Sequence, residues 1–184
     1  SGDSKTAYVV CQENNAIAVV DLATATITNV FALGTKDLSN PDYALDASDK
    51  DDSIGYFRNY DNVYSYFMPD AIAITEIGGT EYLVSANEGD SRDYDGFSEE
   101  VRVKDLDLDP TAFPNAAVLQ LDENLGRMKV TTMAGDTDGD GDYDEIYGYG
   151  GRSFSIWDLD GNLVFDSKNE ITRILAEQFP DNYP

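Results

Sequence analysis

The acidic decapeptide from Asp136 to Glu145 is the segment of this chain whose residue types and spacing point most directly to chemistry. It holds six carboxylates in ten residues, and its two glycines allow sharp backbone turns. Calcium takes about six to eight oxygen ligands in irregular geometry, and acids at alternate positions can supply them. Without a cation, these like charges would repel one another. The loop therefore predicts a calcium site, with a solvated acidic turn as the alternative.

The spacing matches the first half of an EF-hand-type calcium loop. Counting Asp136 as the first position, aspartates also fill the third, fifth and ninth positions, and a glycine fills the sixth. The twelfth position, where an EF-hand carries a bidentate Glu, is Tyr147 here. We therefore expect Asp142 to contribute its backbone carbonyl, and Asp144 or Glu145 to complete the shell. The predicted calcium ligands are Asp136, Asp138, Asp140, Asp142, Asp144 and Glu145.

The composition favours binding of cations over binding of polyanions. There are 36 Asp and Glu residues against 12 Lys and Arg, for a formal net charge of −24. Nucleic acid is therefore an unfavourable partner, and no stretch reaches the roughly 18 apolar residues of a membrane helix. Histidine is absent, which removes the commonest general base and any Ser-His-Asp site within this chain. The composition argues against an enzyme more than for one.

Period-two runs of β-branched and aromatic residues predict a mostly β protein. Such runs flank turns, and so predict hairpins, at Asn14-Asn15, Gly78-Gly79 and Asp160-Gly161. Two further strands are expected over residues 117–121 and 128–132. Helical periodicity occurs only near the C-terminus, where a capping box from Ser167 to Glu170 opens a single short helix that Pro180 ends.

A strand, a polar turn and a strand ending in Asp-Leu recur along the chain. The clearest pair is 16–22 against 153–159. Such repeats are typical of β-propeller blades, and blades of about 40 to 50 residues would number about three to four in this chain. Closed propellers have about four to eight blades. We therefore expect residues 1–184 to form one all-β segment of consecutive four-stranded antiparallel blades, a fragment of a longer propeller protein whose open blade edges favour self-association.

Four ordered blocks of sequence, spread over nearly the whole chain, carry a family resemblance. The blocks are 69–73, 86–94, 99–105 and 146–157. Together they resemble the choice-of-anchor I proteins, which are similar to the mesenchyme-specific cell-surface glycoproteins of animals. The resemblance implies a bacterial extracellular β-propeller, secreted or anchored at the cell surface, whose relatives continue beyond the last residue here. It leaves the biochemical activity undefined.

A second oxygen-rich set stands where predicted inner strands begin or end. Asn87, Glu88 and Asp90 follow one such strand, and Asp70 precedes another. If these oxygens converge on the mouth of a propeller channel, they resemble the metal ligands of calcium-dependent lactonases and phytases of propeller fold. Turn-forming Asx residues are an equal alternative.

Two functions from different classes remain open. The first is a calcium-binding module with an adhesive or structural role, whose tyrosine-rich segment 56–67 contacts protein or glycan at the cell surface. The second is a calcium-dependent phosphoester hydrolase, similar to phytase-like or alkaline-phosphatase-like propellers, which needs Lys and Arg clustered around a phosphate. The cations of this chain are few and scattered, and we expect Arg92, Arg102 and Arg152 to pair with carboxylates instead. The binding role is therefore favoured.

Overall fold

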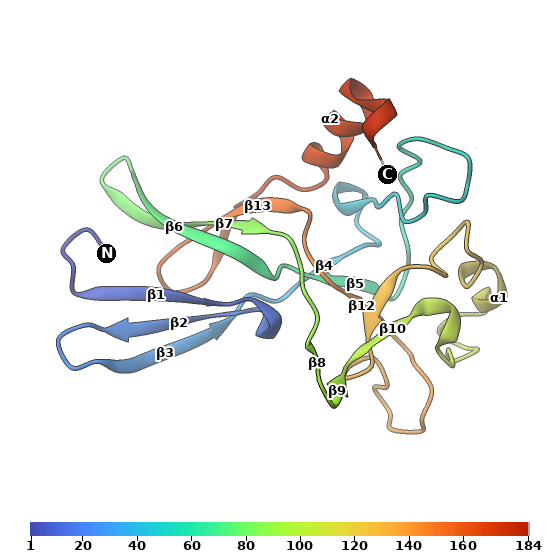
Figure 1. The fold of residues 1–184 in the computed structure, drawn as a ribbon, viewed down its shortest axis with the longest axis horizontal. Coiled ribbons are helices and arrows are strands. Elements are labelled where there is room, and N and C mark those ends of the chain that lie inside the picture. Colours follow the sequence, from blue (N-terminus) through green and yellow to red (C-terminus); the bar gives the residue numbers. More distant parts are fainter. Residues whose placement is uncertain (184) are drawn as a thin grey trace. The chain divides into compact units, whose positions relative to one another are not determined.

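The computed structural model describes residues 1–183, and most of its regular structure is β (Figure 1). The chain divides into two compact units, each assembled from three separate stretches. Unit 1 comprises Ser1–Thr35, Tyr66–Asp90 and Gly150–Lys168. Unit 2 comprises Lys36–Ser65, Ser91–Tyr149 and Asn169–Pro184. The prediction of one propeller segment over residues 1–184 stays a prediction.

Unit 1 contains two antiparallel sheets. The first, in the order β1-β2-β3, is formed by β1 (Thr6–Cys11), β2 (Ala16–Asp21) and β3 (Thr26–Ala32). The second, in the order β14-β13-β7-β6, is formed by β6 (Pro69–Ile77), β7 (Thr80–Asn87), β13 (Ser153–Trp157) and β14 (Leu163–Asp166). The three hairpins expected from turn residues are confirmed as β1–β2, β6–β7 and β13–β14.

Positive φ angles at the turns explain why these hairpins are readable from sequence. Asn15 has a φ of 49°, Gly78 and Gly79 have φ of 61° and 86°, and Gly161 has a φ of 90°. Gly and Asn adopt this left-handed region at the least steric cost. In the core of unit 1, Trp157 meets Phe67 edge-to-face, with ring centroids 5.0 Å apart and an interplanar angle of 82°.

Unit 2 contains a five-stranded mixed sheet and a two-stranded ribbon. The sheet has the order β10-β11-β12-β5-β4. Its strands are β4 (Thr35–Asp37), β5 (Val63–Tyr66), β10 (Glu100–Arg102), β11 (Lys129–Thr131) and β12 (Ile146–Gly148). The ribbon pairs β8 (Asp93–Tyr94) with β9 (Phe97–Ser98). The strand expected over 128–132 is confirmed as β11, and buried Val63, Val130 and Ile146 anchor the core.

The mostly β prediction is confirmed, but the expectation of consecutive four-stranded antiparallel blades is wrong. The four-stranded sheet combines two hairpins that lie far apart in sequence, and the five-stranded sheet includes a parallel pair, β12 with β5. Turn residues report which neighbouring strands form a hairpin. They carry no information on which hairpins then pair side by side, because packing and burial decide that.

A second helix makes the expectation of a single helix wrong. Residues 117–121, expected as a strand, lie partly in α1 (Ala116–Leu119). Leu119 N donates to Asn115 O (3.1 Å) and Gln120 N to Ala116 O (2.9 Å). Periodicity cannot separate a strand from a helix over so short an apolar run, and the inward-facing Leu119 packs in the core in either case.

The C-terminal helix is confirmed as α2 (Glu170–Gln178), but its capping box is wrong. Asn169 occupies the N-cap position, without a side-chain cap. Ser167 Oγ instead accepts a hydrogen bond from Phe154 N (2.9 Å). Short 3₁₀ segments complete the regular structure: η1 (Gln12–Asn14), η2 (Pro41–Tyr43), η3 (Val103–Asp105) and η4 (Pro180–Asn182).

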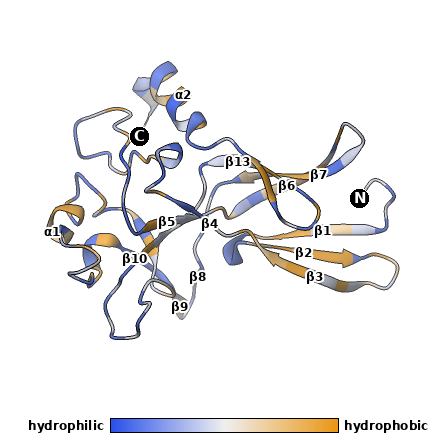
Figure 2. Cartoon of the chain, turned by 180° about the vertical axis from the view of Figure 1, so that it is seen from behind, coloured by the Kyte–Doolittle hydropathy of each residue, from blue (hydrophilic) through white to orange (hydrophobic). Residues whose placement is uncertain are grey.

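Hydropathy follows the strands rather than the loops. Figure 2 shows the apolar residues concentrated on the strands, whereas the long connections are largely hydrophilic. None of the helices in the described chain has the length and apolar character needed to cross a membrane. The polar connections are therefore where binding groups are to be sought.

Candidate metal centre

The acidic loop joins β11 to β12 in unit 2 and is closed at its base by backbone hydrogen bonds. Gly135 O accepts from Asp144 N (2.8 Å) and from Glu145 N (3.0 Å). Gly135 has a φ of 116°, and a Cβ at this position would collide with the carbonyl of Glu145. Glycine is therefore required where the two ends of the loop meet.

A segment distant in sequence holds the far side of the loop. Asp109 N donates to Tyr143 O (3.0 Å), and Tyr143 N donates to Asp107 O (2.9 Å). Leu108, between these two aspartates, is buried in the core of unit 2. The pairing brings Asp109 beside the loop. Sequence reasoning missed Asp109, because no spacing rule links it to residues 136–145.

Two groups of three carboxylates form here and share Asp144. In each group the ligand oxygens lie within 4.8 Å of one another. One group is Asp136, Asp138 and Asp144, and the other is Asp109, Asp142 and Asp144. The structure thus brings together four of the six predicted ligands and adds Asp109. Asp140 and Glu145 belong to neither group.

Glu145 is engaged elsewhere. Its Oε2 accepts a hydrogen bond from the Tyr147 hydroxyl (2.6 Å), and the Tyr147 ring stacks on Tyr64 with centroids 5.1 Å apart. Tyr147 lies in β12, where an EF-hand would place its closing Glu. The position that closes an EF-hand loop therefore carries a strand residue without a carboxylate, and Glu145 is hydrogen-bonded to it.

Hydrogen bonds within the loop orient the first carboxylate group. Asp136 accepts from Gly139 N (2.7 Å) and Gly141 N (3.1 Å). Asp144 Oδ2 accepts from both the backbone N (2.8 Å) and the hydroxyl (2.7 Å) of Thr137. These donors hold the pKa of Asp144 below its usual value, with the Thr137 hydroxyl contributing most. Asp144 therefore stays ionised, which is the state in which a carboxylate can bind a cation.

The pKa of Asp142 shifts in the opposite direction, because the neighbours of Asp142 are acids. Burial, then the charges of Asp140 and Asp109, raise the pKa of Asp142 to about 6. Its Oδ1 is shielded from solvent and has no hydrogen-bond partner. The pKa of Asp138 is also raised, chiefly by the charge of Asp140. A bound cation would relieve this repulsion and supply the missing partner.

The donor set suits a hard cation. All the side-chain ligands are carboxylate oxygens, without imidazole or thiolate, which favours Ca²⁺ or Mg²⁺ over zinc or copper. A glycine-containing loop tolerates irregular geometry, as Ca²⁺ does and Mg²⁺ does not. The residues therefore fit calcium, and the calcium site itself stays a prediction.

The second predicted set does not gather. Asn87 is 4% exposed and donates to the hydroxyls of Ser153 (2.9 Å) and Ser155 (2.7 Å). Asp70, Glu88 and Asp90 are exposed. Within residues 1–183, none of these carboxylates belongs to a group of three that could hold a metal.

Asn87 belongs instead to a buried polar network across β7, β13 and β14. The hydroxyls of Ser153 and Ser155 donate to Asp166 Oδ2 (2.7 and 2.6 Å). Trp157 Nε1 donates to Ser85 Oγ (2.9 Å), and Ser85 Oγ donates to Asn87 Oδ1 (2.8 Å). A one-residue slip would break every one of these bonds, so the network fixes the register. The alternating serines of β13 were the sequence signal for it.

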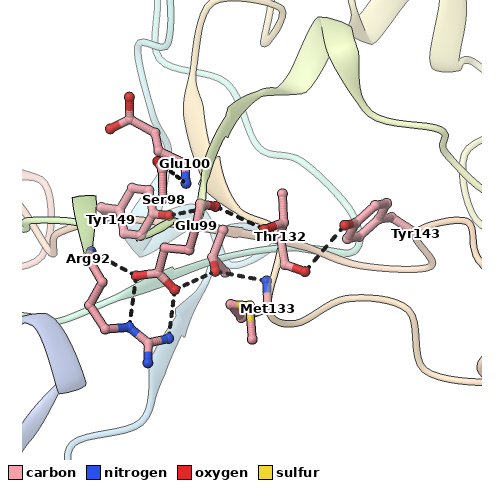
Figure 3. A network of polar contacts seen from close by, with 9 residues as sticks. Arg92, Ser98, Glu99, Glu100, Thr132, Met133, Tyr143 and Tyr149 are labelled. Carbon is pink, nitrogen blue, oxygen red and sulfur yellow. Dashed lines mark hydrogen bonds and ion pairs between the residues drawn. The ribbon is translucent and has the colours of Figure 1, made fainter. Parts of the chain in front are cut away.

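The expectation that Arg92 pairs with a carboxylate is confirmed in unit 2 (Figure 3). Arg92 forks onto Glu99, with Nε 3.2 Å from Oε1 and Nη2 2.7 Å from Oε2, and Thr131 Oγ1 donates to Oε2 (2.9 Å). Burial alone would raise the pKa of Glu99, but the bonds from Arg92 and Thr131 outweigh it and the pKa is lowered. Glu99 is thus a structural carboxylate, neutralised within the chain.

The fold and the loop together define an acidic, mostly β protein with an all-oxygen group of carboxylates on one loop. The family model of the choice-of-anchor I domain matches residues 1–184, the whole chain, and the chain belongs to this family. No curated protein and no solved structure matches it. Choice-of-anchor domains are associated with cell-surface anchoring of extracellular proteins, so the chain is a cell-surface-associated module.

Proposed function

We propose that this chain is a calcium-binding module of a secreted or surface-held bacterial protein, with an adhesive or structural role rather than a catalytic one. The observation that carries the proposal is the pair of carboxylate groups that share Asp144. Five acidic side chains belong to these two groups. Such a concentration of negative charge is unfavourable unless a cation neutralises it.

The first group is the primary site of the proposed ion. Asp136, Asp138 and Asp144 lie on a loop already closed at Gly135, so the entropy lost on binding is small. Asp109 and Asp142 would strengthen the field around the ion. Because Asp109 belongs to a segment that pairs with Tyr143, calcium would fasten two distant stretches of unit 2 together.

A partial β-propeller is the architecture that we propose for this chain. Support comes from the hairpins of unit 1 and from its four-stranded antiparallel sheet. Strand β3 is an edge of its sheet, carries no charged residue, and exposes Ile27 (65%) and Val30 (57%). An uncharged apolar edge of this kind is a template for pairing, which supports self-association through blade edges.

The proposed surface partners are proteins or glycans. Tyr56 is 53% exposed, with the Arg58 guanidinium 4.8 Å from its ring centroid. Exposed aromatic and Arg side chains are enriched at binding surfaces. The phosphoester hydrolase is not supported, because Lys104 pairs with Asp122 (2.9 Å) and Lys129 with Glu100 (2.7 Å) rather than forming a cation cluster.

Equilibrium dialysis with Ca²⁺ tests the proposal. We expect the native chain to bind calcium, and the triple variant D136N/D138N/D144N, called the loop variant below, to lose this site. Asp95→Asn is the matched control, because Asp95 is an exposed acid in the turn between β8 and β9. Equal calcium binding by the native chain and the loop variant would refute the site. Binding lost equally in the Asp95→Asn control would show only a general effect of charge.

A further inference from the structure

A second group of polar side chains in unit 2, outside the acidic loop, contains buried atoms that have no hydrogen-bond partner. It lies on segment 46–60, between β4 and β5. Four of its atoms are shielded from solvent and have no hydrogen-bond partner: Asp46 Oδ1, Asp51 Oδ2, Arg58 Nε and Tyr60 Oη. Asp46 and Tyr60 are 7% and 6% exposed. Buried polar atoms are nearly always paired, so a cluster of four calls for an explanation.

The backbone fixes this cluster. Leu45 and Arg58 exchange backbone hydrogen bonds of 2.8 and 2.9 Å, and Tyr60 N donates to Leu38 O (3.0 Å). Asp46 and Tyr60 are thereby carried on neighbouring, paired backbone. A binding group on paired backbone is preorganised in a way that a free loop is not.

Each aspartate accepts a hydrogen bond through one oxygen only. Asp46 Oδ2 accepts from Tyr56 N (3.2 Å), and Asp51 Oδ1 accepts from Ser53 N (3.0 Å). The other oxygen of each carboxylate accepts no hydrogen bond, although Asp51 Oδ2 lies 3.9 Å from Arg58 Nη2. Burial raises the pKa of the Tyr60 hydroxyl to about 12; Arg58 opposes this rise, and Asp46, Asp51 and Tyr56 add to it. Tyr60 is therefore a neutral hydroxyl, and the Arg58 guanidinium that is ion-paired with Asp51 also lies over its ring.

Arg58 neutralises only part of this charge. Its Nη2 lies 3.9 Å from Asp51 Oδ2 and donates to Glu123 O (3.2 Å). The guanidinium lies over the rings of Tyr56 and Tyr60, with 4.8 and 5.8 Å to their centroids. Two carboxylates against one guanidinium leave one negative charge in excess. An anion is therefore excluded as the ligand, and a cation is favoured.

We propose that Asp46, Asp51 and Tyr60 form a second site for a hard cation of the Ca²⁺ class, separate from the acidic loop. Carboxylate oxygens are the ligand type that such a cation takes, and the neutral Tyr60 hydroxyl adds a third oxygen without a hydrogen-bond partner. A water bound to the cation would accept the hydrogen bond from Arg58 Nε, since Ca²⁺ sites in proteins commonly retain water ligands. One occupant thus accounts for all four unpartnered atoms.

The experiment uses the full chain with the loop variant as background, so that calcium at the acidic loop does not contribute. Terbium is the first probe, because Tyr56 and Tyr60 beside the cluster would sensitise its luminescence. Calcium is the second, by equilibrium dialysis. We expect the loop variant to retain a saturable site, with terbium emission displaced by Ca²⁺. A loop variant that binds neither ion overturns this site while leaving the proposal for the acidic loop intact.

Two substitutions on this background locate the site. Asp51→Asn should abolish the residual calcium binding, and Tyr60→Phe should weaken it about tenfold, as loss of a supporting group does at metal sites. Tyr60→Phe should leave the metal-free melting temperature unchanged or higher, since it removes an unpartnered buried hydroxyl. Asp61→Asn, at an exposed acid next to Tyr60, is the control. Equal calcium binding in Asp51→Asn and Asp61→Asn, with both folded by circular dichroism, overturns the proposal.

Discussion

Glu99 and Asp142 are both shielded carboxylates of unit 2, but their neighbours differ in charge. Glu99 meets Arg92 and Thr131, and its pKa is lowered. Asp142 meets Asp140 and Asp109, and its pKa is raised to about 6. The first is neutralised within the chain and needs no ligand. The charge of the second is not neutralised by the protein, so a bound cation would offset the repulsion from its acidic neighbours.

The largest expected effect comes from breaking the neutralised pair. Arg92→Ala would leave Glu99, which is 3% exposed, buried and unpaired. Loss of one partner of a buried pair costs about 3 to 5 kcal/mol, and partial solvent screening of Arg92 places the expected loss at about 2 to 3 kcal/mol. Urea unfolding measures this loss. Lys5→Ala, at an exposed pair, should change the unfolding free energy by less than about 0.5 kcal/mol. Equal losses in Arg92→Ala and Lys5→Ala would contradict the claim that Arg92 neutralises a buried carboxylate.

The buried network of unit 1 adds a third carboxylate to this comparison. Asp166 accepts hydrogen bonds from two serine hydroxyls of the chain and belongs to neither proposed calcium site. Asp166→Ala would leave the hydroxyls of Ser153 and Ser155 without their acceptor. We expect a loss of about 1 to 3 kcal/mol in the unfolding free energy, the usual cost of unsatisfied buried polar groups. The loss should be the same with calcium or chelator, measured by urea unfolding. A loss that depended on calcium would show that Asp166 takes part in metal binding.

The smallest effect is expected at Asp142, in the absence of calcium. Because its folded pKa is about 6 and its ordinary value is 3.8, the folded chain binds this proton more tightly than the unfolded chain. Protonation therefore stabilises the fold, fully below pH about 4, and the stability is lost as the pH rises through about 6. Asp142→Asn should flatten the melting temperature over this window and raise it slightly at pH 7. An unchanged pH profile would contradict the repulsion described here.

The turns of this chain were predictable from sequence, whereas the helix over part of residues 117–121 and the contacts between distant segments were not. Asn15, Gly78 and Gly161 mark turns by their conformational freedom. Alternating aspartates mark the acidic loop, and its cation stays a prediction. The pairing of Leu108 with Tyr143, which delivers Asp109, depends on two segments meeting in the fold. The failure at Ser167 has the same origin, because its hydroxyl serves a strand rather than the helix that follows it.

Thermal melts of the native chain and of Asp144→Asn, each in calcium and in chelator at pH 7, test the central claim most directly. Asp144 is the carboxylate that both groups share, so its substitution should remove the part of the calcium response that comes from the acidic loop, and leave the part that comes from the second proposed site. At a calcium concentration about a hundred times the dissociation constant, binding to the folded form alone adds about 2.7 kcal/mol. The account predicts a clearly higher melting temperature in calcium for the native chain, and a smaller difference for Asp144→Asn. Identical melting temperatures of the native chain in calcium and in chelator would contradict it.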